Sequence, residues 1–441
     1  MSQQARASAP HRLCGALLSL FFATSLPTAA QGAGEAAPAV AAPAAKFAPE
    51  VYRARRERLM KRLGDGVAVL YSRGEEDRDG FLQDSDFHYL TGVEDPGAVL
   101  VLSPSERVFK EWLFLKPRDQ DDERWTGERA DIGDALRLAT GFERILRTTA
   151  LNGRVVALLR NTHTLHQINQ AGNLDGKAPE RELYGKLQAA IPEVSVKDRT
   201  DLLPALRSVK EPRELEYMER AIAATLAAHR VAARSIRPNV QENWVEGLIA
   251  LEFRRAGAVR PAFGSIVGSG RNSTVLHYPK HDQAIAPGSL VVVDIGADYG
   301  HYAADVTRTY PADGQFTAEQ RAIYEVVLRA QQAAMEMIRP GVYYEDLHGK
   351  AEQVIAEAGY RDYFIHGLGH FVGLEVHDAG LYSKPLEAGM VITVEPGIYI
   401  PHKALGVRIE DEVLVTPKGY RLMSGDVPRD PAAIERLMRG N

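Results

Sequence analysis

The chain has 441 residues, of which 45% are hydrophobic and 25% are charged, and its formal net charge is −5. This composition is typical of a folded globular protein and excludes a disordered chain. No basic run or stripe stands out, so the sequence does not indicate a nucleic-acid-binding protein. At roughly 100–200 residues per domain, the length predicts two domains.

Residues 1–30 have the pattern of a secretory signal. A basic segment, residues 6–12, precedes the apolar run Leu13–Leu26, and small residues follow. The run is shorter than the roughly 20 residues that cross a bilayer, so no membrane span is expected. We expect cleavage after Ala30 and a secreted or periplasmic protein, with a buried N-terminal helix as the alternative. Residues 31–46 are rich in Ala and Pro and are expected to form a flexible spacer.

Cysteine chemistry is not expected in the mature protein. Cys14 is the only cysteine of the chain and lies inside the predicted signal. After cleavage, no disulfide and no thiolate nucleophile would remain. Any metal ion would therefore be held by oxygen and nitrogen ligands.

Residues 47–203 are predicted to form an α/β domain. Helical patterns occur at Glu50–Leu63 and Arg181–Ile191. Short apolar runs bounded by Gly, Pro, Ser or charged residues are expected to be strands. These runs are Val67–Tyr71, Ala98–Leu102, Trp112–Leu115 and Val155–Leu159. The alternation of the two patterns favours an α/β arrangement.

Residues 204–441 follow a different pattern, with long amphipathic helices and strand pairs. Pro212 and the acids after it predict the start of a long helix. The expected helices are Arg213–Ser235, Thr317–Arg339 and Tyr344–Ala358. The expected strand pairs are Val291–Ala297 with His301–Tyr310, and Val391–Ile400 with Gly406–Val415. Helices that are separate from antiparallel hairpins indicate an α+β domain.

The first hairpin carries two aspartates. Asp294 lies inside an apolar strand, where an unpaired charge would cost several kcal/mol. If the turn centres on Tyr299-Gly300, Asp294 and Asp305 oppose each other directly. A divalent metal ion between them would relieve the repulsion. The alternative is that Asp305 lies on the surface and that Asp294 pairs with an arginine such as Arg308.

The second hairpin repeats this arrangement with two glutamates. Glu395 ends an apolar run, and Glu410 lies on the returning strand. With a loop centred on His402-Lys403, the two glutamates oppose each other. Two opposed pairs of acids in one domain favour a metal site over chance.

Histidines supply a further ligand type. His366 and His370 are flanked by glycines, which let the backbone approach a metal ion or substrate closely, and His377 follows. A lone histidine is more often structural, but these three lie near two acidic pairs. An oxygen-rich set with one imidazole suits Mn²⁺, Co²⁺, Fe²⁺ or Zn²⁺ better than copper. Two such ions would match four carboxylates and support hydrolysis. The predicted acidic metal ligands are Asp294, Asp305, Glu395 and Glu410, with one of these histidines as the fifth ligand.

The motifs that carry these residues resemble the pita-bread metallopeptidases, which include methionine aminopeptidase, prolidase and aminopeptidase P. The matching segments are Ile266–Tyr278, Val293–Tyr310, His366–Asp378, Thr393–Ile400 and Gly406–Glu412. All five ligand positions that this family requires are occupied, and the resemblance implies that His370 is the imidazole ligand beside Asp294, Asp305, Glu395 and Glu410. In the N-terminal half, QDSDFHYLTG at Gln83–Gly92 resembles aminopeptidase P and some prolidases.

This resemblance implies an Xaa-Pro aminopeptidase with a pita-bread catalytic domain and two metal ions, Mn²⁺ above all and otherwise Co²⁺ or Zn²⁺. Its partners would be peptides with proline at the second position, and a homodimer or homotetramer is expected. The alternatives are an Xaa-Pro dipeptidase and, more remotely, a non-enzymatic peptide-binding protein on the same fold.

The resemblance also implies roles for single residues. Glu395 would accept a proton from water in addition to binding metal. His277 and His377 would contact the substrate carbonyl, and His366 would lie near the proline. Arg408 would support Glu410 or a neighbouring acid. The plainer alternatives are an ordinary loop histidine for His277 and a surface charge for Arg408.

Overall fold

The computed structural model describes residues 41, 44–74, 81–169 and 179–440. The predicted signal and most of the predicted spacer therefore lie outside the described residues. Within the described ranges, no helix combines the length and the apolar character that a membrane crossing requires.

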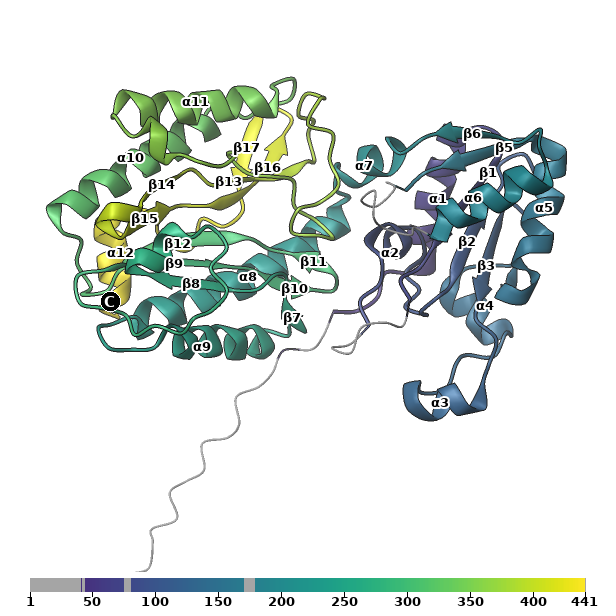
Figure 1. Ribbon diagram of the computed structural model, residues 1–441, viewed down its shortest axis with the longest axis horizontal. Helices are drawn as coiled ribbons and strands as arrows, with labels where there is room; N and C mark the ends of the chain where they lie inside the picture. Colours follow the sequence, from purple (N-terminus) through teal and green to yellow (C-terminus); the bar gives the residue numbers. More distant parts are fainter. Residues whose placement is uncertain (1–40, 42–43, 75–80, 170–178, 441) are drawn as a thin grey trace, which may run out of the picture. The chain divides into compact units, whose positions relative to one another are not determined.

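The N-terminal half contains a six-stranded mixed sheet in the order β4-β3-β2-β1-β5-β6 (Figure 1). β2 lies antiparallel to β1 and β3, and the outer pairs are parallel. The strands are β1 Val67–Tyr71, β2 Val99–Leu102, β3 Glu111–Leu115, β4 Ile145–Arg147, β5 Thr164–Gln167 and β6 Ser195–Asp198. This sheet confirms the predicted α/β character.

Helices flank this sheet, and one of them corrects the sequence analysis. Val155–Leu159 is not a strand but the middle of α5, because Leu151, Val155, Leu158 and Leu159 recur at helical spacing on one buried face. A short apolar run alone cannot distinguish a buried strand from a buried helical turn. The helices are α1 Pro49–Leu63, α2 Ser85–Thr91, α3 Gln120–Thr126, α4 Asp134–Thr140, α5 Leu151–Thr162, α6 Pro179–Ala190 and α7 Leu202–Arg207.

The second half has the predicted long helices and two that were not predicted, α9 and α12. α8 begins at Pro212, and a capping box between Glu211 and Glu214 satisfies the first free amide groups. α8 and α9 pack against the strands β8, β9 and β12, whereas α10 packs against β13, β14 and β15 (Figure 1). The helices are α8 Pro212–Ser235, α9 Glu242–Arg255, α10 Ala318–Met335, α11 Tyr344–Glu357 and α12 Pro431–Met438.

The strands of this half form small antiparallel sheets. The orders are β11-β10-β7, β12-β9-β8, β13-β16-β17 and β14-β15. The strands are β7 Arg260–Pro261, β8 Ile266–Ser269, β9 Leu290–Ile295, β10 Ala297–Tyr299, β11 Tyr302–Ala303, β12 Val306–Pro311, β13 Val391–Val394, β14 Gly397–Ile400, β15 Leu405–Arg408, β16 Asp411–Thr416 and β17 Gly419–Leu422.

The register of the first hairpin differs from the prediction. Asp294 opposes Thr307 and not Asp305. Tyr299 pairs with Tyr302, so the turn centres on Gly300 and His301, which have φ angles of 60° and 72°. The turn therefore lies one residue later than expected, and every pairing moves by two residues.

The register of the second hairpin is as predicted. Val394 opposes Asp411 and Gly397 opposes Arg408. Glu395 and Glu410 lie between these pairs and therefore face each other.

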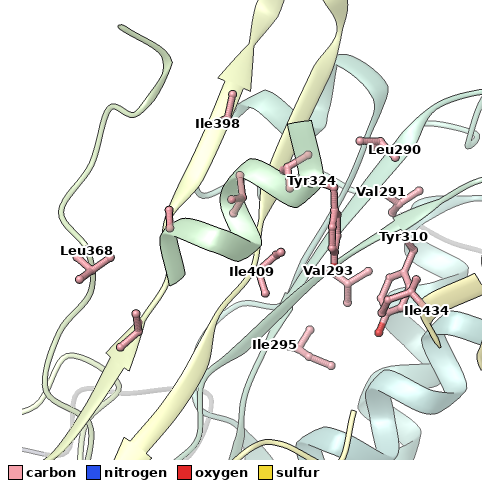
Figure 2. Close-up of a cluster of buried hydrophobic side chains, with 14 of the residues drawn as sticks. Leu290, Val291, Val293, Ile295, Tyr310, Tyr324, Leu368, Ile398, Ile409 and Ile434 are labelled. Carbon is pink, nitrogen blue, oxygen red and sulfur yellow. The ribbon is translucent and has the colours of Figure 1, made fainter. Parts of the chain in front are cut away.

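A continuous hydrophobic core holds the first hairpin in place. Val291, Val293 and Ile295 of β9 point into this core, together with Tyr310 of β12 and Tyr324 of α10 (Figure 2). Successive side chains of a strand point to opposite faces, so Asp294 lies on the face away from this core. Each fully buried aliphatic side chain stabilises the fold by about 1.5–3 kcal/mol. This packing fixes the backbone on which the acid is carried.

Candidate active site

Every predicted site residue lines one cavity of about 780 Å³ in the second half of the chain. The cavity is also lined by aromatic side chains such as Phe263, Tyr278 and Tyr382. The predicted residues that line it are His277, Asp294, Asp305, His366, His370, His377, Glu395, Arg408 and Glu410.

Asp305, His370 and Glu410 form the innermost cluster. One ligand atom from each of these buried residues lies within 4.8 Å of the others. His370 Nε2 is 3.4 Å from Asp305 Oδ2 and 3.4 Å from Glu395 Oε1. Nδ1 of the same ring donates to the Phe371 carbonyl at 3.1 Å, which leaves Nε2 free to face the carboxylates. Burial, together with His377, lowers the pKa of His370 to about 4, so the ring is neutral, as a metal ligand must be.

The carboxylates of the cluster repel one another. Burial first, and then the neighbouring acids, raise the pKa values of Asp305 and Glu410 well above their usual range. Burial and the charge of Asp294 likewise raise the pKa of Glu395 to about 8. Asp294 Oδ1, Asp305 Oδ1 and Glu410 Oε1 are buried and have no hydrogen-bond partner within the described ranges. An unsatisfied buried polar atom costs about 1–3 kcal/mol. This donor set therefore fits divalent cations, which would neutralise the acids and bind these oxygens.

Arg408 is the cation that supports Asp294. Its Nη2 donates to Asp294 Oδ2 at 2.6 Å, and its Nη1 donates to the Tyr399 hydroxyl at 2.9 Å. The alternative pairing with Arg308 is wrong, because Arg308 binds Asp411 at 2.8 Å. Arg408 was expected to support Glu410 or a neighbouring acid, and the neighbouring acid is Asp294.

Other residues that orient the acids were missed in the sequence analysis. The Thr307 hydroxyl donates to Glu410 Oε2 at 2.7 Å, and the Thr393 hydroxyl donates to Glu395 Oε1 at 3.3 Å. Glu412 Oε1 accepts from the backbone N–H of Asp305 at 2.7 Å. Each of these residues lies two positions from a predicted ligand. Strand alternation places such residues on one face and could have identified them.

The histidines of the cavity differ in exposure: His370 is buried, His366 is half-buried, and His277 and His377 are exposed. His366 Nε2 lies 2.9 Å from the Tyr399 hydroxyl, and burial, with the charge of Arg408, lowers its pKa to about 4. His377 is exposed and stacks on His370 with ring centroids 4.0 Å apart. His277 is also exposed in the cavity. The two exposed imidazoles can therefore contact a ligand directly.

Gly369 allows a close approach to Thr393, whereas approach of these glycines to a metal ion or substrate stays a prediction. A Cβ atom at Gly369, where φ is +153°, would lie 2.4 Å from Thr393 Oγ1. The absence of this atom lets the His370 N–H reach Thr393 Oγ1 at 3.0 Å. Gly367, in contrast, has open space around it.

Comparisons with known proteins agree with this fold and site. The model of metallopeptidase family M24 matches residues 216–417, and that of the aminopeptidase P N-terminal domain matches residues 52–166. The Xaa-Pro aminopeptidase of Haemophilus influenzae is 35% identical, with 89% of this chain and 98% of that protein covered. That of Escherichia coli is 33% identical, with 88% and 97% covered. An Xaa-Pro dipeptidase of Pyrococcus furiosus is 42% identical, with 51% of this chain and 65% of that protein covered.

Solved structures show the same similarity. Proline aminopeptidase P II from Yersinia pestis gives a TM-score of 0.81 at 31% identity, with 90% of this chain and 100% of that chain covered. Aminopeptidase P from E. coli with the inhibitor Pro-Leu gives 0.81 at 31% identity, with 90% and 99% covered.

Fold and site together define a metal-dependent hydrolase. The chain belongs to metallopeptidase family M24 and combines a pita-bread catalytic domain with an aminopeptidase P-type N-terminal domain. Membership in this family implies divalent metal ions. Both matched ranges fall within the predicted domains, and the domain boundaries at 46/47 and 203/204 stay predictions.

Proposed function

We propose that this protein is an Xaa-Pro aminopeptidase, which releases the first residue of a peptide whose second residue is proline. The observation that carries the proposal is the cluster of buried acids and a neutral imidazole at the base of an open cavity. Similarity to Xaa-Pro aminopeptidases along almost the whole chain supports the substrate class.

The proposed metal ligands are the four acids and one histidine that the sequence indicated, and they would hold two ions. We propose Mn²⁺, with Co²⁺ or Zn²⁺ as the alternatives, because oxygen-rich sites with an imidazole suit these metals. When bound, the ions supply Lewis acidity, which acidifies water and polarises a carbonyl group. The ligands are Asp294, Asp305, His370, Glu395 and Glu410.

The remaining roles follow from what each side chain can do. Glu395 is the proposed proton acceptor, since its carboxylate faces the cavity and is oriented by the Thr393 hydroxyl at 3.3 Å. His277 and His377 are exposed and can donate to the oxygen of the scissile carbonyl. His366, fixed by Tyr399, would contact the proline side of the substrate. Arg408 holds Asp294 in its orientation.

The chemistry of the Xaa-Pro bond explains why a dedicated enzyme is needed to cleave it. The nitrogen of an Xaa-Pro bond carries no hydrogen, so a peptidase that depends on this donor cannot use such a substrate. In the proposed mechanism, Glu395 accepts a proton from water and His277 and His377 donate to the carbonyl oxygen, so no step needs that hydrogen. The preference for proline itself is supported by the relatives.

Peptide hydrolysis tests the proposal. The metal-free protein is loaded with Mn²⁺, Co²⁺ or Zn²⁺ and assayed on Xaa-Pro-Yaa, Xaa-Pro and Xaa-Ala-Yaa peptides of the same first residue. We expect turnover of Xaa-Pro-Yaa, far slower turnover of Xaa-Ala-Yaa and the highest rate with Mn²⁺.

Turnover of Xaa-Pro without turnover of Xaa-Pro-Yaa would replace the proposal by the second candidate, an Xaa-Pro dipeptidase. The similarity of part of the chain to an Xaa-Pro dipeptidase favours this candidate over others. No turnover and no bound metal would instead favour a peptide-binding protein.

We also propose export to the periplasm or the exterior after cleavage at Ala30, and assembly into a homodimer or homotetramer. The apolar run at Leu13–Leu26 supports export. N-terminal sequencing of the mature protein and sedimentation of the purified protein test these two points. A mature chain that begins at Met1 in the cytoplasm would contradict the first, and a monomer would contradict the second.

A further inference from the structure

A second group of possible metal ligands lies among residues that do not line the active-site cavity. His88 belongs to α2, Glu94 follows this helix, and His301 lies in the turn between β10 and β11. One ligand atom from each of the three lies within 4.8 Å of the others. Glu94 Oε1 is 2.8 Å from His88 Nδ1 and 3.3 Å from His301 Nε2.

We propose that His88, Glu94 and His301 bind a single zinc ion, with water as the fourth ligand. Two imidazole nitrogens and one carboxylate oxygen form a donor set that binds Zn²⁺ in preference to Mg²⁺ or Ca²⁺. Tetrahedral zinc with bonds of about 2.0–2.2 Å places its ligand atoms about 3.3–3.5 Å apart. The separation of Glu94 from His301 already has this value, and that from His88 must widen by about half an ångström.

The exposure of the three side chains shows which of them can make this adjustment. The His88 side chain is 10% exposed, whereas those of Glu94 and His301 are each 30% exposed. The buried imidazole is therefore fixed, and the two outer ligands can move towards an entering ion. The two rings stack with centroids 3.9 Å apart and planes 29° from parallel, so the more exposed His301 ring would turn to direct Nε2 at the same ion as His88.

The backbone at His301 is a second observation. Its φ of 72° is uncommon for a residue other than glycine, and such conformations cost on the order of 1 kcal/mol unless the surroundings determine them. The His301 N–H donates to Asp298 Oδ1 at 3.0 Å, which holds the turn. This strained turn is what presents the imidazole to His88 and Glu94.

A small cavity of about 190 Å³ adjoins both histidines and provides room for the ion and its water. The charges on its wall are nearly balanced. Arg260 pairs with Asp298 at 2.5 Å, and the wall also carries Arg73 and Glu375. The cation would therefore meet no excess of positive charge.

Zinc at this position would join α2 to the β10–β11 turn. These elements are more than 200 residues apart in the sequence, as the positions of His88 and His301 show. The ion would therefore stabilise the tertiary structure. It has no role in the proposed hydrolysis, and the proposal does not rest on that function.

Zinc counting on the full-length protein tests this inference. Wild type and variants are stripped with a chelator, dialysed against buffered Zn²⁺ and measured for zinc per chain. We expect His301→Asn and Glu94→Gln to bind one zinc ion fewer than wild type. Asparagine is chosen because it tolerates a positive φ. The expected zinc-induced rise in melting temperature is also smaller in both variants.

A matched control is available in the same chain. His163 is an exposed histidine with a φ of 51° at the end of α5, and it is outside the cluster. His163→Asn should keep the wild-type count. Equal counts in wild type, His301→Asn and Glu94→Gln would overturn the proposal, as would an equal loss in the control. If His301→Asn does not fold, the zinc count of Glu94→Gln alone tests the proposal.

The active-site metals are separated by a further variant. Asp305→Asn should lose zinc from the active site but keep the zinc ion held by His88 and His301. Mn²⁺-dependent peptidase activity should survive in Glu94→Gln and not in Asp305→Asn. Failure of the zinc site and failure of the proposed function therefore give different results.

Discussion

Two sets of buried acids in the catalytic domain differ in how their charge is balanced. Asp378 is buried with Arg207 at 2.5 Å and Lys210 at 3.1 Å, and Asp411 is buried with Arg308 at 2.8 Å. Asp305 and Glu410 are equally buried, but among the described residues no lysine or arginine forms an ion pair with either of them. The charge of the first set is neutralised by basic side chains of the protein, and the charge of the second set requires a bound cation.

The pKa values follow the same division. Burial alone would raise the pKa of Asp378, but the charges of Arg207 and Lys210 outweigh it, and its pKa is lowered. Burial and like charges together raise the pKa values of Asp305 and Glu410. Equally buried acids therefore have opposite pKa shifts, and the charge of the neighbouring groups determines the direction. The unpaired set reduces stability in the metal-free protein and creates a binding site for metal.

The largest effect is expected from Asp305→Asn. It should lower kcat/KM by more than about 100-fold, because residues that only orient a metal ligand are typically worth about 10–100-fold. Bound metal should fall with activity. The chelator-treated variant should be no less stable than chelator-treated wild type, because one repelling charge is gone. Metal analysis, peptide hydrolysis and urea unfolding measure these effects. A large loss of stability without metal would contradict the division between the two sets.

Asp378→Ala should have the opposite profile. It leaves Arg207 and Lys210 buried without their partner, and breaking a buried ion pair in this way costs about 3–5 kcal/mol. The free energy of unfolding in urea is the measurement. Asp121→Ala is the control, because its pair with Arg124 is exposed and should be worth less than about 1 kcal/mol. Similar decreases in the free energy of unfolding of both variants would show that burial does not determine how much an ion pair stabilises the protein.

Arg408→Lys tests the arginine that pairs with Asp294 in the metal-binding set. Lysine keeps the charge but cannot donate in the planar, forked geometry that reaches Asp294 and Tyr399 together. We expect kcat/KM to fall by about 10–100-fold, with weaker metal binding and little change in stability. Arg421→Lys, in the exposed pair with Glu219, is the control. Unchanged metal affinity in Arg408→Lys would remove the proposed supporting role.

The smallest effect is a pH dependence of stability that arises from His229. This buried imidazole has a hydrogen-bond partner at each ring nitrogen while it is neutral. Its ring nitrogens lie 2.9 Å from the Val306 carbonyl and 3.1 Å from the Tyr310 hydroxyl. Burial, with the charge of Arg308, lowers its pKa from 6.5 to about 3. Below pH 6.5 the unfolded state therefore binds more protons than the folded state, and stability is lost as the pH falls.

His229→Gln should remove the contribution of His229 to the loss of stability at low pH. The slope of the unfolding free energy between pH 6.5 and pH 4 should become shallower by up to about 1.4 kcal/mol per pH unit. Urea unfolding in chelator across this range measures it, with the exposed His163→Gln as the control. An unchanged slope would mean that His229 is protonated in the folded protein.

The sequence alone singled out residues that line one cavity and the strand faces on which its acids lie. The register predicted for Asp294 and Asp305 was wrong by two residues, yet both acids still line one cavity. A shift by two keeps every side chain on its face, because the strand period is two. The same rule explains why Arg308 does not reach Asp294. It opposes Val293 and therefore points to the other face.

The tertiary structure decided what local patterns leave open. It placed Val155–Leu159 in a helix, because short apolar runs fit both kinds of element. It selected Arg408 as the partner of Asp294, and it placed His88 and Glu94 beside His301. Contacts between residues so far apart in the chain depend on how whole elements pack. No period in the sequence encodes that packing.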